Sequence, residues 1–226
     1  MHVGILVPHS NTVLESDLHC LLPPSVKTHT QRWKITPRHS STEGDELARV
    51  ASLNEHLGEA VDLLPADHLQ LLVYGCTTGS FMGGLGGLKQ LETSISESTG
   101  LPVVSVSQAI VDVLKFRSLT RIAVFTPYDH RVNVIMEDFL TQNGLEVAHV
   151  AQDPWFASGA RRHAGSEPQQ EILQFVAREF QNDVDAVVLS CSAWAVLPVR
   201  EELQQTLGVP VISANQAIAS AILTRL

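Results

Sequence analysis

The sequence has no basic cluster and no hydrophobic run long enough to cross a bilayer. Its 226 residues hold 15 lysines and arginines against 24 aspartates and glutamates, a formal net charge of −9. Such a chain is poorly suited to nucleic acids or anionic lipid surfaces, and a spanning helix would need about 20 apolar residues in succession. The first residues also lack the basic region of a secretory signal. We therefore expect a cytoplasmic protein with neither nucleic acid nor membrane as a partner.

Cysteine is scarce as well, with three residues at positions 20, 76 and 191. An odd number of widely spaced cysteines does not make a disulfide framework, so free thiols are expected. The ten histidines form no pair at zinc-binding spacing, and the glycines of residues 83–87 match no nucleotide-binding motif. We therefore expect no metal site and no nucleotide-binding loop of the dinucleotide or Walker type. Cys20, inside a predicted helix, is expected to be a small core residue.

What the sequence does contain is an alternation of strand and helix patterns that runs through four units and then repeats. The predicted strands cover residues 3–7, 26–35, 71–76, 101–106, 121–126, 145–150 and 184–189, and residues 208–218 repeat the strand-containing segment 100–110. The predicted helices cover residues 12–22, 46–64, 88–98, 108–116, 132–143, 168–180 and 201–207, with a last helix from residue 215. This alternation predicts parallel sheets, and 44% hydrophobic residues suffice for a full core.

The repeat predicts an α/β fold with two pseudo-symmetric Rossmann-like lobes, each a four-stranded parallel sheet flanked by helices, and an active site in the cleft between them. We assign residues 1–113 and 214–226 to the N-terminal lobe and residues 114–213 to the C-terminal lobe, with the last helix crossing back. Two polar stretches, residues 37–44 and 153–166, are predicted as loops, and the first could cover a site.

Each half carries one cysteine directly after a buried strand, followed by hydroxyl residues. The two segments are Cys76-Thr77-Thr78 and Cys191-Ser192. Ligands of open parallel sheets bind beyond the carboxyl ends of the strands, where Asn11 and Tyr128 are also expected. Two facing lobes would therefore bring all these residues to one cleft.

Paired thiols in such a cleft suit proton transfer or nucleophilic addition. A cysteine at the start of a helix meets unpaired N–H groups and the positive end of the helix dipole, which favour the thiolate. A second thiol that stays protonated can serve as the acid, and the nearby hydroxyls and amides suit a carboxylate or an enolate oxygen. A single buried cysteine is more often a packing residue, but the matched pair favours catalysis.

Four short motifs carry a resemblance to a known family. They are Pro8-His9-Ser10-Asn11-Thr12, Gly75-Cys76-Thr77, Thr126-Pro127-Tyr128 and Leu189-Ser190-Cys191. Through them the whole chain resembles the aspartate/glutamate racemase superfamily, within it the branch of maleate cis-trans isomerases and arylmalonate decarboxylases. The resemblance implies two lobes, no cofactor, paired cysteines and a small carboxylate substrate, and we expect a homodimer. The decarboxylases keep only the second cysteine, so the resemblance favours an isomerase or a racemase.

The isomerase analogy implies a role for each site residue. Cys76 would add to an alkene carbon of maleate, the new single bond would rotate, and Cys191 would supply and later remove a proton. The residues implied to hold the two carboxylates are Asn11, Tyr128 and the backbone amides of Thr77, Thr78, Cys191 and Ser192. The sequence departs from the family pattern in two places, because His9 replaces a serine and residues 153–166 lack a substrate-binding asparagine.

Three functions therefore stay open at this point. The first is cis-trans isomerisation of maleate or a related unsaturated diacid. The second is a two-thiol racemase acting on an amino acid, a hydantoin or an arylmalonate-type acid, which the missing asparagine favours. The third is a non-catalytic two-lobe module that binds a small molecule and would not need its thiols.

Overall fold

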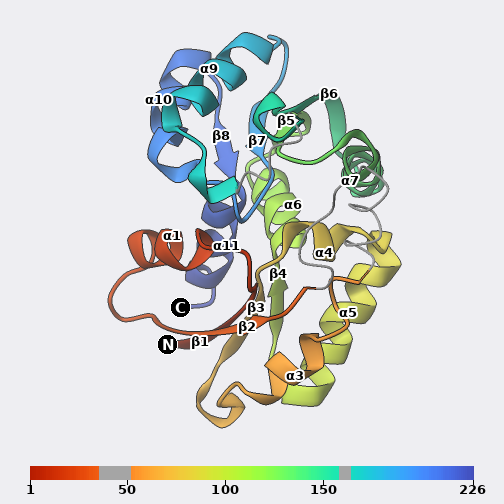
Figure 1. Ribbon diagram of the computed structural model, residues 1–226, viewed down its shortest axis with the longest axis vertical. Helices are drawn as coiled ribbons and strands as arrows, with labels where there is room; N and C mark the ends of the chain where they lie inside the picture. Colours follow the sequence, from red (N-terminus) through yellow and green to blue (C-terminus); the bar gives the residue numbers. More distant parts are fainter. Residues whose placement is uncertain (36–51, 158–163) are drawn as a thin grey trace.

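Two four-stranded parallel sheets form the centre of the computed structural model, which describes residues 1–35, 52–157 and 164–226 (Figure 1). The first sheet contains β1 (His2–Pro8), β2 (Lys27–Trp33), β3 (Leu71–Tyr74) and β4 (Val103–Ser105), in the order β2-β1-β3-β4. The second contains β5 (Arg121–Thr126), β6 (Glu146–Gln152), β7 (Ala186–Leu189) and β8 (Val211–Ser213), in the order β6-β5-β7-β8. The identical order confirms the predicted repeat.

The central strands are apolar along their whole length because helices cover both faces of each sheet. All residues of β3 and β7 are buried, as are those of β1 after its first residue. This is the pattern of strands in a doubly covered parallel sheet. The outer strand β2 is mostly polar, and only Trp33 at its end is fully buried. Because the strands themselves are apolar, the polar residues that follow their carboxyl ends are the ones that can form a site.

The helices follow the predicted alternation with shifted ends. In the first half they are α1 (Leu14–Leu21), α3 (Leu57–Asp62), α4 (Thr77–Phe81), α5 (Gly84–Thr99) and α6 (Val106–Phe116). In the second half they are α7 (His130–Gln142), α8 (Pro154–Ala157), α9 (Gln169–Glu179), α10 (Arg200–Leu207) and α11 (Ala214–Leu223). Short 3-10 turns cover Ala66–His68, Ala164–Ser166 and Leu197–Val199.

Two helices differ from their predicted ranges by more than the others do. The helix predicted over residues 46–64 is helical only over α3, since residues 52–56 form turns and residues 46–51 lie outside the described residues. The helix predicted from residue 88 begins at Gly84 instead. Gly83 and Gly87 lie so close that a Cβ on Gly83 would be 2.8 Å from the Gly87 Cα atom. The glycines therefore allow a close-packed first turn of the helix.

The last helix returns to the first half of the chain. Helix α11 packs against α1 and α6, and Asn215 Nδ2 donates a hydrogen bond to Asp17 Oδ2 at 2.8 Å. Both chain ends lie in the lower part of Figure 1. This packing supports the lobe division that we propose, residues 1–113 with 214–226 and residues 114–213.

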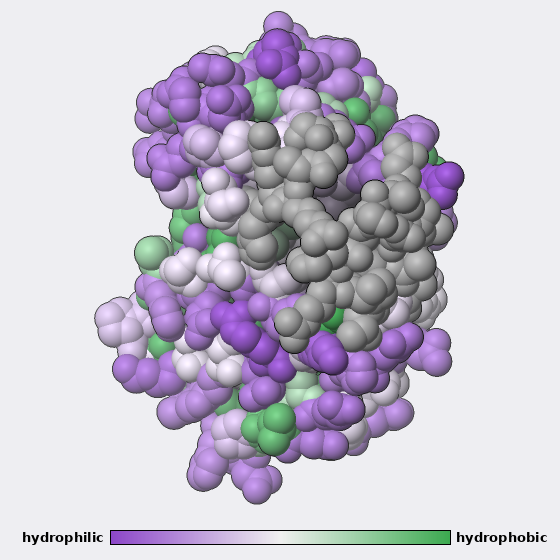
Figure 2. Space-filling view, in the orientation of Figure 1, coloured by the Kyte–Doolittle hydropathy of each residue, from purple (hydrophilic) through white to green (hydrophobic). Residues whose placement is uncertain are grey.

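The prediction that Cys20 is a core residue is wrong. Cys20 is exposed on α1 and is not the core residue that its type indicated, because the buried face of α1 is formed by Leu14, Asp17 and Leu18. The face of the molecule in Figure 2 is mostly hydrophilic. Among the described residues, no helix is long and apolar enough to span a membrane. The loop predicted over residues 37–44 lies outside them, as do residues 158–163 of the second loop.

Candidate active site

The two halves meet at the carboxyl ends of their strands, and Ser192 makes hydrogen bonds between them. Its backbone N–H donates to Thr77 Oγ1 at 2.9 Å, and its hydroxyl donates to the Gly75 carbonyl at 3.0 Å. The same hydroxyl accepts a hydrogen bond from Asn11 Nδ2 at 3.2 Å. The turns after β1, β3 and β7 are thus held together by buried hydrogen bonds, which brings the two predicted cysteines to one place.

Cys76 is the N-cap residue of α4, at the turn where β3 ends. Its Sγ atom accepts a hydrogen bond from the Gly79 N–H at 3.4 Å and lies 3.5 Å from the Thr78 hydroxyl. N–H groups in the first turn of a helix favour a negatively charged partner. The predicted placement of Cys76 at a helix start is confirmed, and its surroundings can stabilise a thiolate.

Tyr74 lies beside Cys76 and was not among the predicted site residues. Its ring is fully buried and stacks on Trp33 with 5.4 Å between ring centroids, while its hydroxyl donates to Asn54 Oδ1 at 2.5 Å. Burial, followed by the charge and hydrogen bonding of Cys76, raises the pKa of Tyr74 well above its usual value. A tyrosine in an otherwise aliphatic strand, two residues before the cysteine, is the sequence signal that distinguishes this residue.

Cys191 has different surroundings from Cys76. It follows β7, but the next residues form a turn in which the Trp194 N–H donates to the Cys191 carbonyl at 3.2 Å. Burial raises the pKa of the Cys191 thiol to about 11, while hydrogen bonds from Tyr128 and from the backbone N–H groups of Ala193 and Trp194 oppose the shift. Cys191 is therefore protonated at neutral pH. Its pKa also responds to the charge of Cys76, as expected for neighbouring thiols.

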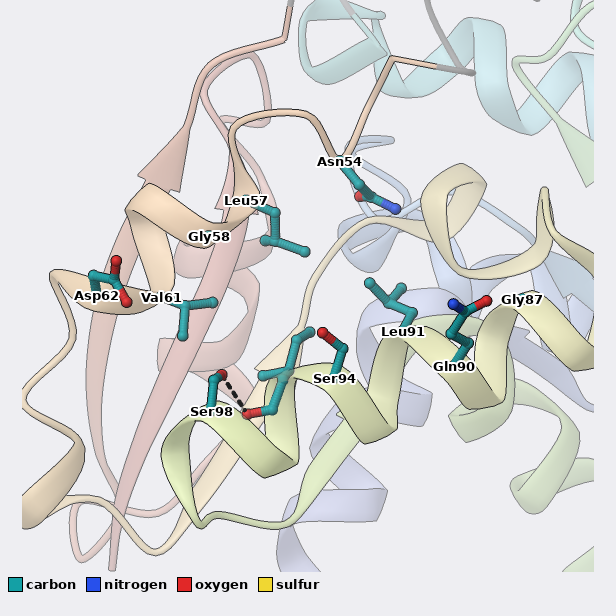
Figure 3. A pocket seen from close by; sticks show the side chains of 11 residues that line it. Asn54, Leu57, Gly58, Val61, Asp62, Gly87, Gln90, Leu91, Ser94 and Ser98 are labelled. Carbon is teal, nitrogen blue, oxygen red and sulfur yellow. Dashed lines mark hydrogen bonds between the residues drawn. The ribbon is translucent and has the colours of Figure 1, made fainter.

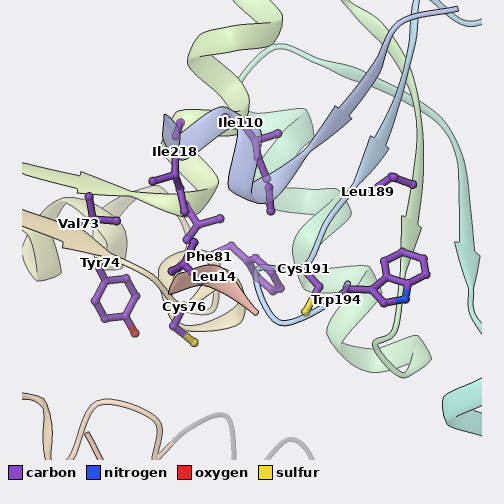
Figure 4. Packing of buried hydrophobic residues seen from close by; sticks show 14 of the residues in the cluster. Leu14, Val73, Tyr74, Cys76, Phe81, Ile110, Leu189, Cys191, Trp194 and Ile218 are labelled. Carbon is purple, nitrogen blue, oxygen red and sulfur yellow. The ribbon is translucent and has the colours of Figure 1, made fainter. Parts of the chain in front are cut away.

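Figure 4 shows how the two thiols are presented. Cys76 and Cys191 lie at the edge of the buried hydrophobic cluster, and both sulfur atoms point to the same side of it. Phe81 lies between the two turns in this view. The apolar packing beneath the thiols fixes their backbones and excludes water from one side of the site.

Tyr128 places a phenol next to both cysteines. Its backbone is held by hydrogen bonds from its N–H to Thr126 Oγ1 and from Asn133 Nδ2 to its carbonyl. Its Oη atom is buried and interacts with Cys191 and Thr77. Burial, and next the charge and hydrogen bonding of Cys191, raises the pKa of this phenol well above its usual value. Tyr128 therefore places a neutral O–H group beside the Cys191 sulfur.

All seven predicted site residues lie in this region, but they are not equally available. The Asn11 side chain also accepts hydrogen bonds from the N–H groups of Val13 and Leu14. Thr77 and Ser192 are bonded to each other across the two halves. The expectation that the Ser192 amide holds a carboxylate therefore does not fit this arrangement, because its N–H already has a partner. Tyr128 also contacts the first half, because its ring packs against Phe81 with 6.0 Å between ring centroids.

A buried acidic pair is a further feature that the sequence did not reveal. Trp194 Nε1 donates to Glu167 Oε2 at 2.6 Å, and Asp153 interacts with Glu167. Both carboxyl groups are buried. Asp153 fell within a predicted polar loop, and nothing local indicated that it would meet a residue 14 positions later in the chain.

Figure 3 shows a cavity that is separate from this region. It has a volume of about 450 Å³, lies between α3 and α5, and contains neither cysteine. Asn54, at one end of it, is the partner of Tyr74. Within the described ranges, no group of three or more histidine, cysteine or acidic residues could hold a metal ion.

Maleate isomerases and an arylmalonate decarboxylase are similar to this chain in sequence. The maleate isomerase of Geobacillus stearothermophilus is 25% identical over 99% of this chain and 91% of its own length. The maleate isomerase of Alcaligenes faecalis is 25% identical over 94% of this chain and 85% of its own length. The arylmalonate decarboxylase of Bordetella bronchiseptica is 25% identical over 95% of this chain and 86% of its own length.

Solved structures agree with the fold. A variant of the Nocardia farcinica maleate cis-trans isomerase with a covalently bound succinylcysteine intermediate superposes with a TM-score of 0.85, at 23% identity over 99% of this chain and 91% of that one. A structure of arylmalonate decarboxylase superposes with a TM-score of 0.76 at 22% identity, over 100% of this chain and 92% of that one. The family model described as arylmalonate decarboxylase matches residues 49–226. The chain therefore belongs to the family of arylmalonate decarboxylase, as the paired strand-end motifs indicated.

Proposed function

We propose that this protein is a cofactor-independent isomerase that uses Cys76 and Cys191 to interconvert the cis and trans forms of maleate or a related unsaturated dicarboxylate. The observation that carries the proposal is the pair of neighbouring thiols with unlike surroundings. One caps a helix and accepts N–H bonds, and the other is protonated through burial. The relatives named maleate isomerase, and the related structure with a succinylcysteine intermediate, support the same reaction.

The first step is addition of the Cys76 thiolate to one alkene carbon. The C–S bond forms with the sulfur electron pair while the π electrons move toward the neighbouring carbon and its carboxylate. Cys191 then gives its S–H proton to that carbon, which completes a succinyl thioether. Rotation about the new single bond exchanges the cis and trans arrangements.

The second half reverses these events. The Cys191 thiolate removes the proton, the C=C bond re-forms, and the Cys76 thiolate leaves, so that atoms and charges balance. Tyr128 can donate its O–H to the oxygen on which charge develops, a contribution of the oxyanion-hole type. The N–H groups of Ala193 and Trp194, which face the Cys191 sulfur, stabilise that thiolate while it exists.

Proton NMR of the purified protein with maleate tests the proposal directly. We expect fumarate to form without an added cofactor, and we expect Cys76→Ser and Cys191→Ser each to reduce kcat by at least about a thousandfold, as for other removed catalytic nucleophiles. Cys20→Ser removes the exposed thiol and is the matched control, with unchanged turnover. An absence of conversion of maleate and of related unsaturated diacids would contradict the proposal.

The same experiment in D₂O separates the remaining alternatives. A two-thiol racemase would place deuterium on the α-carbon of a chiral acid without cis-trans conversion. A binding module would retain its ligand affinity in both cysteine variants. The asymmetry of the two thiols favours a reaction in which one acts as nucleophile and the other as acid.

We also propose that the enzyme is a homodimer in the cytoplasm. The family resemblance supports the dimer, and the need to keep two neighbouring thiols reduced supports a reducing compartment. Light scattering of the purified protein and fractionation of the source cells test these two points separately.

A further inference from the structure

Asp153 and Glu167 form a buried carboxyl pair that the proposed reaction does not use. Asp153 follows β6 and is 1% exposed, while Glu167 precedes α9 and is 5% exposed. Asp153 Oδ2 and Glu167 Oε1 each lack a hydrogen-bond donor in the part of the chain that the structure describes. Two ionised carboxylates only accept hydrogen bonds. A single proton between them would satisfy both oxygens at once.

The surroundings of the pair favour such a proton. Burial is the largest cause that raises the pKa of both acids, and it raises that of Glu167 to about 8 together with the nearby Asp153. Among the described residues, the charged groups that face the pair lie on α9. Arg178 lowers the pKa of Asp153, whereas Glu171 raises that of both acids. Since burial outweighs the effect of Arg178, the pair retains a proton at neutral pH.

The pair is connected to Cys191 through Trp194. Glu167 Oε2 accepts the indole N–H of Trp194 at 2.6 Å, and the indole is fully buried against Phe175, with 6.4 Å between ring centroids. The backbone N–H groups of Trp194 and Ala193 face the Cys191 sulfur. A carboxyl pair that fixes the indole therefore also fixes the peptide groups around the thiol.

We propose that Asp153 and Glu167 share one proton and act together, through Trp194, as positioning residues for the Cys191 turn. The catalytic consequence rests on the proposed function, because it assumes that Cys191 transfers a proton. With the proton in place, Glu167 holds the indole and the turn keeps its geometry. Loss of the proton at alkaline pH sets two buried negative charges against each other, which displaces Glu167 and disorders the turn.

Glu167→Gln tests the shared proton most directly, because its uncharged amide mimics a protonated Glu167. Its amide N–H can donate to Asp153 and its carbonyl can accept the indole N–H. We expect kcat at pH 7 within about threefold of the parent, and no fall in kcat above pH 8 where the parent falls. We expect Glu167→Leu to lower kcat by about ten- to a hundredfold with KM changed less than threefold, because it leaves the indole without a partner.

Glu137→Gln, an exposed change on α7, is the matched control and should keep the parent pH profile. An alkaline fall of kcat in Glu167→Gln equal to that of the parent would overturn the shared proton. An unchanged kcat in a folded Glu167→Leu variant would overturn the positioning role.

Thermal unfolding as a function of pH tests the pair without any substrate. An acid whose pKa is raised on folding binds more protons in the folded state than in the unfolded state, so stability falls as pH rises from its ordinary value near 4.5 to its folded value near 8. We expect the Tm of Glu167→Gln to gain several degrees on the parent across this window and to level off above it.

Parallel Tm curves for Glu167→Gln and the parent would contradict the shared proton, whatever the substrate is. A diverging curve in a protein that does not convert unsaturated diacids would instead keep the pair and refute the proposed function.

Discussion

Cys76 and Cys191 follow buried strands in matching positions, yet their surroundings differ. Cys76 caps α4 and accepts the Gly79 N–H, whereas Cys191 starts a non-helical turn and has its pKa raised by burial. Tyr128 contributes to the surroundings of both sulfurs. At the scale of single residues, the proposed roles of nucleophile and acid rest on burial and backbone geometry, because the two side chains are chemically identical.

Tyr128→Phe tests the role of the phenol. Its Oη atom interacts with Cys191 and Thr77, and removal of a neutral hydrogen bond of this kind should change the free energy of unfolding by about 0.5 to 1.5 kcal/mol. We expect kcat to fall by about a hundred- to a thousandfold, as when one oxyanion donor is removed. Steady-state kinetics and urea unfolding measure the two effects. A large loss of stability without a loss of kcat would show that the hydroxyl is structural.

At the scale of elements, the short helix α4 positions Cys76, and it tolerates no side chain at Gly79. A Cβ at Gly79 would overlap Tyr74 Oη and lie 3.3 Å from the Cys76 sulfur. Gly86 in α5 has no atom within 4 Å of the same position. A side chain would therefore clash at Gly79 but not at Gly86, although both glycines lie in the glycine-rich segment of residues 79–87.

Gly79→Ala and Gly86→Ala form a matched pair of variants. We expect Gly79→Ala to lose about 1 to 3 kcal/mol of unfolding free energy through overpacking and at least tenfold in kcat, because the Tyr74 and Cys76 side chains must move. Gly86→Ala should gain about 0.5 to 1 kcal/mol through helix propensity, with kcat unchanged. Chemical denaturation and kinetics of both variants check this. Equal kcat values in the two variants would refute the steric constraint.

At the scale of the whole molecule, the site exists because two sheets of equal topology meet at their strand ends. Ser192 joins the turns of the first half, and its carbonyl also accepts a hydrogen bond from Asn215 Nδ2 on α11 at 3.2 Å. Asn215 is in turn bonded to Asp17 on α1. The relative position of the two thiols depends on this buried polar network.

Ser192→Ala removes the hydroxyl at the centre of that network. It leaves Asn11 Nδ2 and the Gly75 carbonyl without this partner, which we expect to cost about 1 to 3 kcal/mol of unfolding free energy. We also expect kcat to fall more than KM rises, because the separation of the thiols changes while the first half stays intact. Calorimetry and steady-state kinetics measure both, with Thr93→Ala on the exposed face of α5 as the control. An unchanged kcat would argue against a role in positioning.

Local periodicity and strand-end chemistry sufficed to predict the two four-stranded sheets, the order of the elements and the gathering of Cys76 and Cys191. These features depend on short-range patterns, since apolar runs form buried strands and parallel strands end at a common edge. Helix ends were less predictable, because the close approach of Gly83 and Gly87 is a packing property.

The tertiary structure alone decided which polar groups are available. It exposes Cys20, places Tyr74 beside Cys76, and uses the Ser192 amide to join the halves. It also brings Asp153 and Glu167 together beneath Trp194. Hydrogen-bond partners and burial depend on contacts between residues far apart in the chain, and a sequence pattern reports only neighbours. The sequence by itself determined that two thiols lie at strand ends, and the packing of the two halves decided that they have unlike surroundings, with Cys191 kept protonated by burial.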